Sequence, residues 1–186
     1  ALMRCIGRFA KQAGVEFCFE DVCPALLYGE PGSEDAVETR LDIHLWSGGQ
    51  QWLLEVWVDV TVIHPWQKKL RARAAGTNGA AALAAEQRKW RRYGEGRGGV
   101  SVSPFAVETC GLLGGGVEDL LRRLSAHWAW VTRARRGASS ARERRWRAEL
   151  GVAMVRAQAA TLLKAAVDSS PRDVGVESCG EEVDSD

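Results

Sequence analysis

The sequence has few cysteines and no long apolar run. Its five cysteines are an odd number at scattered positions, so we expect no disulfide framework and a reducing compartment, nuclear or cytoplasmic. Cys18 and Cys23 lack the second pair that a zinc site needs, which favours buried free thiols. No stretch of about 18 apolar residues occurs, and no apolar core follows the first residues. We therefore expect neither a membrane span nor a signal peptide.

The composition is that of a globular protein, with 46% hydrophobic and 26% charged residues among 186. We predict one domain over residues 1–167 and an acidic, disordered tail over residues 168–186. Because the first residue is not methionine, we expect the chain to belong to a longer polypeptide.

The net charge of +1 hides an uneven distribution. The tail from Asp168 onward carries seven acids against Arg172 alone, which leaves a charge of +7 on the rest of the chain. A basic body with an acidic tail favours a polyanionic partner.

Hydrophobic periodicity and turn residues predict a helix, a strand, a long β-hairpin, a helix, a strand and two more helices. The fold class is therefore α/β, a mixed central sheet flanked by helices. The expected helices cover residues 2–13, 80–93, 117–135 and 141–167, and the expected strands cover residues 15–19, 40–46, 51–64 and 100–109.

The hairpin carries the first sign of a site. One face of its second strand is apolar without interruption, whereas the other face includes Glu55 and Asp59. A carboxylate is costly to bury, so on a strongly β-forming strand we expect it to have a specific role. Asp42 on the first strand points to the same side. A turn centred on residues 47–50 would place Asp42 opposite Glu55, and a later centre would place it opposite Asp59, so both pairings remain open.

Carboxylates and a lysine are what metal-dependent phosphodiester cleavage requires. Mg²⁺ takes few protein carboxylates and keeps several waters. The ion acidifies a bound water and offsets charge on the phosphate, and a lysine can stabilise the transition state. A hairpin with acids beside a helix with Lys89 supplies these parts.

Several segments together resemble the PD-(D/E)XK nuclease superfamily, and more narrowly the restriction-endonuclease-like segment at the C-terminal end of some retroelement reverse-transcriptase polyproteins. The resemblance covers about residues 1–165 and rests on Arg40-x-Asp42, a glycine turn, Asp59-Val-Thr61-Val, Lys89-x-x-x-Tyr93 and Pro104-Phe-Ala-Val-Glu-Thr-x-Gly111. It implies a restriction-endonuclease-like core of a helix, three strands, a helix and a further strand.

The resemblance also implies roles for individual residues. Asp42 and Asp59 would bind Mg²⁺ or Mn²⁺ together with the backbone carbonyl of Val60. The family's usual lysine, two residues after the second acid, is replaced here by Thr61. Some members carry this lysine on the following helix, where Lys89 stands. Further candidates, as ligands, supports or purely structural residues, are Glu16, Glu20, Glu55, Glu86, Tyr93, Glu108 and Thr109.

The expected partner is nucleic acid, with DNA as the form that the resemblance implies, and we expect no membrane partner. The basic residues that would contact phosphates are Lys68, Lys69, Arg71, Arg73, Arg91, Arg92, Arg135 and Arg136. Trp66 or Trp90 could stack on a base. Three hypotheses follow: a Mg²⁺- or Mn²⁺-dependent endonuclease domain, an inactive nucleic-acid-binding module of the same fold, or an inert fragment with exposed acids. The oligomeric state is not predicted.

Overall fold

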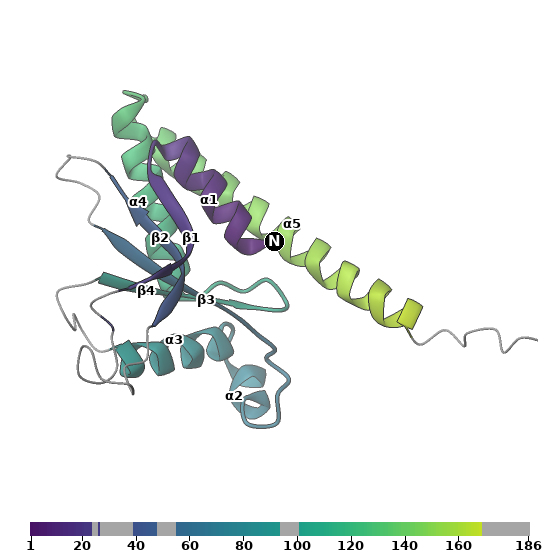
Figure 1. Cartoon of the computed structure of the whole chain (residues 1–186). Coiled ribbons are helices and arrows are strands. Elements are labelled where there is room, and N and C mark those ends of the chain that lie inside the picture. Colours follow the sequence, from purple (N-terminus) through teal and green to yellow (C-terminus); the bar gives the residue numbers. More distant parts are fainter. Residues whose placement is uncertain (24–25, 27–38, 48–54, 94–100, 169–186) are drawn as a thin grey trace, which may run out of the picture.

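The chain folds as a four-stranded sheet between two helical layers (Figure 1). The computed structural model describes residues 1–23, 26, 39–47, 55–93 and 101–168. Its elements are α1 (Leu2–Ala13), β1 (Glu16–Val22), β2 (Arg40–Trp46), β3 (Val56–Ile63), α2 (Arg71–Gly76), α3 (Ala80–Tyr93), β4 (Ser101–Glu108), α4 (Gly115–Val131) and α5 (Ala138–Asp168). This order confirms the predicted fold class, and the short helix α2 is the one described element that the sequence did not predict.

The sheet has the strand order β1-β2-β3-β4. β1 and β2 are antiparallel, as are β2 and β3, whereas β3 and β4 are parallel and are joined through α3. Pro104, which predicts a bulge or a strand entry, lies inside β4, opposite Asp59. An edge strand tolerates proline because one of its sides has no neighbour to bond.

Alternation along β3 divides the core between the two layers. Val56 and Val58 belong to the cluster that α1, α4 and α5 complete. Trp57 packs with Tyr93 of α3, and Ile63 packs with alanines of the same helix. Because side chains alternate along a strand, Asp59 faces α3 as well.

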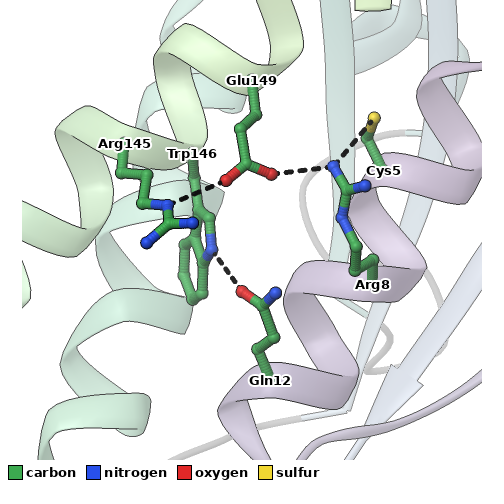
Figure 2. A network of polar contacts seen from close by, with 6 residues as sticks. All are labelled: Cys5, Arg8, Gln12, Arg145, Trp146 and Glu149. Atoms are coloured by element: carbon green, nitrogen blue, oxygen red, sulfur yellow. Dashed lines mark hydrogen bonds and ion pairs between the residues drawn. The ribbon is translucent and has the colours of Figure 1, made fainter.

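Polar contacts and an aromatic stack dock α5 onto α1 (Figure 2). The Trp146 ring is fully buried and stacks on Phe9 with centroids 5.1 Å apart, and its Nε1–H donates to Gln12 Oε1 at 2.8 Å. Glu149 accepts from Arg8 at 2.8 Å and from Arg145 at 3.2 Å. The first half of α5 is thus part of the domain.

The last turns of α5 extend beyond the domain body (Figure 1). Leu162 and Leu163 are 71% and 67% exposed, and Val131 at the end of α4 is 48% exposed. The helical period of residues 117–135 predicts that Val131 faces inward, and this prediction is wrong, because no described side chain covers it. By length and composition alone α5 could cross a membrane, a criterion that the core helix of a soluble protein also meets. The expectation that no segment spans a membrane stays a prediction.

The glycines at the start of α4 allow a close approach to a buried carboxylate. Glu86 of α3 accepts from the backbone N–H of Gly115 at 3.1 Å and of Gly116 at 2.9 Å. A Cβ at Gly114 would lie 2.1 Å from Glu86 Oε1, and one at Gly116 would lie 2.0 Å from the Pro104 carbonyl oxygen. A larger residue would have to displace the Glu86 side chain at Gly114 and the β4 backbone at Gly116.

Four cysteines in the described chain carry free thiols, as predicted. Cys5 and Cys23 are buried, but Cys18 and Cys110 are exposed, so the prediction of burial is wrong for those two. Several predictions fall outside the described residues. They concern the loop at 24–38 apart from Leu26, the hairpin turn after Ser47, the first part of the second hairpin strand, the glycine-rich loop after α3 and the tail.

Candidate active site

The hairpin register brings Asp42 to Asp59. The paired residues of β2 and β3 are Ile43 with Val58, His44 with Trp57 and Leu45 with Val56. One further step in this register sets Asp42 opposite Asp59. Of the two registers that the sequence left open, the one with the later turn centre is therefore correct.

Asp42 lies where the ladder is interrupted. The pairs of β1 and β2 run to Phe19–Ile43 and resume at Asp21–Leu41, so Asp42 falls in the gap. Its neighbour in that register, Glu20, is exposed and has a φ of 55°, a conformation unusual outside glycine. Asp42 Oδ2 accepts a hydrogen bond of 2.6 Å from the backbone N–H of Val60. This contact fixes the Asp42 carboxylate against β3.

Two side chains from α3 reach Asp59. The Lys89 ammonium forms an ion pair with Oδ1, and the Tyr93 hydroxyl donates to Oδ2 at 2.5 Å. The Lys89 and Asp59 side chains are only 15% and 17% exposed, and Tyr93 is buried. The helical spacing of four residues places Lys89 and Tyr93 on one stripe of α3, above the same carboxylate. The structure thus brings together the three residues that the sequence predicted as catalytic, along with Tyr93.

The surroundings of Asp42 favour a proton or a cation on this pair of acids. Burial raises the pKa of Asp42 above its ordinary value, the Val60 hydrogen bond opposes this, and the neighbouring charge of Asp59 adds to the rise. The Lys89 ammonium lowers the pKa of Asp42 and so opposes part of this rise.

Glu55 does not join this cluster. It binds His44, whose Nε2 lies 2.8 Å from Glu55 Oε1 and whose Nδ1 lies 3.1 Å from Asp21 Oδ2. The His44 ring also stacks on Trp57, with centroids 3.8 Å apart. The alternative pairing of Asp42 with Glu55 is therefore wrong. The sequence did not identify Asp21 as a partner of His44, because the two residues are 23 positions apart in the chain.

Two other candidate acids have structural positions. Glu86 caps the start of α4, and burial raises its pKa while the hydrogen bonds it accepts from backbone amides oppose the rise. Glu108 Oε1 accepts from the backbone N–H groups of Ala81 and Ala82, at the start of α3. Free N–H groups at a helix start attract carboxylates. Glu108 therefore has the structural role that was one of its two alternatives. Glu86 contacts the α4 amides, so the predictions that it ligates a metal with Asp59 or holds Lys89 are not met.

The remaining candidates lie near the cluster or apart from it. Thr61 is half-buried and shares the α3 side of β3 with Asp59. Thr109 contacts His64 at 2.9 Å, at the far end of that strand. Glu16 pairs with Trp46 at the opposite end of β1 from Glu20. The role of the Val60 carbonyl as a metal ligand stays a prediction.

The candidate phosphate-binding residues are all exposed, but they lie in two places. Those of α2, its approach and α3 belong to the layer that carries Lys89. Arg135 and Arg136 lie in the connection from α4 to α5, which Figure 1 shows at the opposite end of the molecule from α2. The structure does not bring Arg135 and Arg136 to the Asp42–Asp59 pair.

The donor set at the cluster fits a magnesium-like ion better than zinc. The described residues contain no group of three His, Cys, Asp or Glu side chains around one point. Two adjacent carboxylates are the kind of donor set that Mg²⁺ uses, with waters and substrate oxygens as its other ligands. Asp42 and Asp59 would hold the ion in their deprotonated form.

Comparison with known proteins adds no relative to this description. No family model matches the chain, and neither the search of curated proteins nor that of solved structures finds a significant match. The resemblance to PD-(D/E)XK nucleases therefore rests on the residues themselves.

Proposed function

We propose that the cluster of Asp42, Asp59 and Lys89 is the active site of a metal-dependent endonuclease that hydrolyses phosphodiester bonds in DNA. The observation that carries this proposal is the position of Lys89. The residue two places after the second acid is Thr61, and α3 delivers an ammonium group to Asp59 from the next element instead. Lys89 lies on a different element from the lysine that the family usually carries, and yet its ammonium group reaches Asp59. This arrangement supports a catalytic role for the three residues over the alternative that the acids are merely exposed.

Each residue has a distinct task in this proposal. When bound, Mg²⁺ or Mn²⁺ would supply an acidified water and offset charge on the phosphate. Asp42 and Asp59 would hold the ion, with Asp42 kept in place by the Val60 amide. Tyr93 fixes the Asp59 carboxylate through its hydroxyl. Lys89 would leave its ion pair with Asp59 to stabilise charge on the phosphate as the bond breaks.

The same resemblance suggests that the parent polypeptide is a retroelement polyprotein, in which such a domain would nick the target DNA. This origin belongs to the proposal and would set the biological substrate, not the chemistry of the cluster.

A second candidate function is a nucleic-acid-binding module with an inactive site. The observation that favours it is that both carboxylate oxygens of Asp59 already have protein partners, Lys89 on one and Tyr93 on the other. A carboxylate held so firmly by protein groups has to release one of them before it can bind a metal ion. This module would bind DNA through the same basic residues without cutting it.

Supercoiled plasmid incubated with Mg²⁺ or Mn²⁺ tests the proposal. The wild-type protein should nick the plasmid, EDTA should stop it, and Asp59→Asn should slow nicking by about 10³-fold or more, equivalent to about 4 kcal/mol of transition-state stabilisation. Glu55→Gln is the matched control, since it removes an exposed acid of the same hairpin that binds His44 instead, and it should cut normally. Wild-type rates in Asp59→Asn would contradict the proposal. Retardation of the plasmid on a gel without nicking would favour the binding module.

A further inference from the structure

The layer formed by α2 and α3 presents positive charge with no exposed negative charge. Residues 64–93 contain eight lysines and arginines and one carboxylate, Glu86. Glu86 is 4% exposed and is turned towards the amides at the start of α4. The surface of this layer is therefore uniformly basic, which is the electrostatic requirement for a polyanion.

Six of these eight cations have no counter-ion within the described part of the chain. Lys89 pairs with Asp59, whereas the described residues provide no ion-pair partner for Lys68, Lys69, Arg71, Arg73, Arg88 or Arg91, all of which are exposed. Exposed cations of this kind can neutralise phosphates, and the nucleic acid then releases its condensed counterions, which favours binding.

Two large indole rings are exposed on the same layer. Trp66 is 66% exposed and Trp90 is 45% exposed, although Trp57 and Trp146 in the core are 3% and 0% exposed. An exposed aromatic ring among arginines and lysines is the feature on which unpaired bases stack. In a duplex the bases are stacked on one another inside the helix, so few base faces are accessible to these rings.

The two indole rings lie near opposite ends of α3. Trp90 directly follows Lys89, so it projects about 100° around the helix from the side chain that reaches Asp59. Trp66 borders a small cavity with Asn78, just before the start of α3. About ten residues of helix separate Ala80 from Trp90, which corresponds to about 15 Å. A strand of several nucleotides can extend over this distance.

We propose that the α2–α3 surface binds single-stranded or locally unpaired nucleic acid, with Trp66 and Trp90 as stacking sites for bases. The inference rests on the proposed function only in placing that strand beside the Asp42–Asp59 pair. It narrows the substrate class to nucleic acid that is single-stranded or opened near the cleavage point.

Fluorescence anisotropy of labelled oligonucleotides tests this inference, with EDTA present so that cleavage plays no part. The probes are an oligothymidylate of about 12 nucleotides, within the usual range of single-strand sites, and a duplex of equal length. We expect the single strand to bind more tightly. Trp66→Ala and Trp90→Ala should each weaken its binding about 5- to 100-fold, as expected for the loss of one base stack, with little change for the duplex.

Trp130→Ala is the matched control, because Trp130 is 49% exposed but lies on α4 in the other helical layer. It should leave both affinities unchanged, and Trp90→Phe should retain most of the single-strand affinity because phenylalanine can still stack. Equal or tighter binding of the duplex, no binding of either probe, or Trp66 and Trp90 variants that both match the Trp130 control would overturn the inference. Because no metal is present, a failure to cleave plasmid would not affect this result, so the two proposals fail separately.

Discussion

The two basic regions of the chain look alike in sequence but differ in what surrounds their charges. In α4 and α5 four arginines, Arg122, Arg123, Arg145 and Arg147, pair with carboxylates. Arg147 binds Glu118 at 2.6 Å and Glu143 at 3.1 Å, and Arg145 pairs with Glu149. In the α2–α3 layer the one acid is buried, and six exposed cations have no ion-pair partner among the described residues. The difference teaches that a count of arginines does not locate a binding surface, because some of these charges are used within the fold.

The tryptophans repeat this contrast. Trp146 of α5 is buried against Phe9 and holds two helices together. Trp90 of α3 is 45% exposed beside Lys89. One region uses its aromatic and basic residues to stabilise the fold, and the other leaves them available to a partner.

The largest expected effect concerns these two aromatic residues. Trp146→Ala should lower the free energy of unfolding by about 3–5 kcal/mol, because it empties a buried site and removes the hydrogen bond to Gln12. Trp90→Ala, a change of exposed surface, should alter it by less than about 0.5 kcal/mol. Urea unfolding followed by circular dichroism measures both. Comparable losses in the two variants would contradict the contrast.

Charge removal should separate the two basic regions next. The combined change of Lys68, Lys69, Arg71 and Arg73 to Ala should weaken DNA binding roughly 100-fold at low salt and lower the slope of log K against log[salt] by about 0.9 for each phosphate that is no longer neutralised. The matched variant changes Arg133, Arg135 and Arg136, which are exposed at the other end of the molecule, and should weaken binding less than about threefold. A larger loss of DNA affinity in this second variant would mean that the binding surface lies at α4 and α5.

The acid pair should respond to pH in the direction set by Asp42. Because folding raises the pKa of Asp42, the stability this group contributes is present below its unfolded pKa and is lost as the pH rises through the folded pKa. Asp42→Asn keeps an oxygen for the Val60 amide and removes the charge. In EDTA it should therefore raise the stability at pH 7 by about 0.5–2 kcal/mol and have little effect near pH 3. A destabilised variant at pH 7 would show that the ionised carboxylate is favourable there.

The smallest effect is expected at the surface ion pairs of α5. Glu149→Gln removes the charge that Arg8 and Arg145 share, yet both pairs are solvent-accessible. The free energy of unfolding should fall by about 0.2–1 kcal/mol, and less at high salt. Thermal unfolding at two salt concentrations measures this. A loss that does not change with salt would mean that packing, not charge, is affected.

Much of the fold follows from local pattern. The helices at 2–13 and 80–93 and the strand at 40–46 have the predicted bounds, because each combines a clear period with a glycine or turn nearby. The ends of α4 and α5 and the exposure of Leu162 and Leu163 did not follow, since the period of a helix says nothing about how far its neighbours extend.

The candidate site could be predicted only in part from local sequence patterns. Strand alternation puts Asp42 and Asp59 on one side, but the choice between Glu55 and Asp59 depends on a turn register that composition does not fix. Glu86 lies three residues before Lys89 on the same stripe, and yet it serves the glycines of α4, whose approach is a matter of tertiary packing. Long-range partners of this kind have no signature in the local sequence.

A transfer of the lysine is the most direct test of the account. Lys89→Ala should slow single-turnover plasmid nicking by about 10²-fold or more, as removal of one transition-state donor does, whereas Lys164→Ala, an exposed lysine of α5, should not. Adding Thr61→Lys to Lys89→Ala places the lysine two residues after Asp59, on the same side of β3, and should restore a large part of the rate. Normal nicking by Lys89→Ala would contradict the claim that α3 supplies the catalytic lysine.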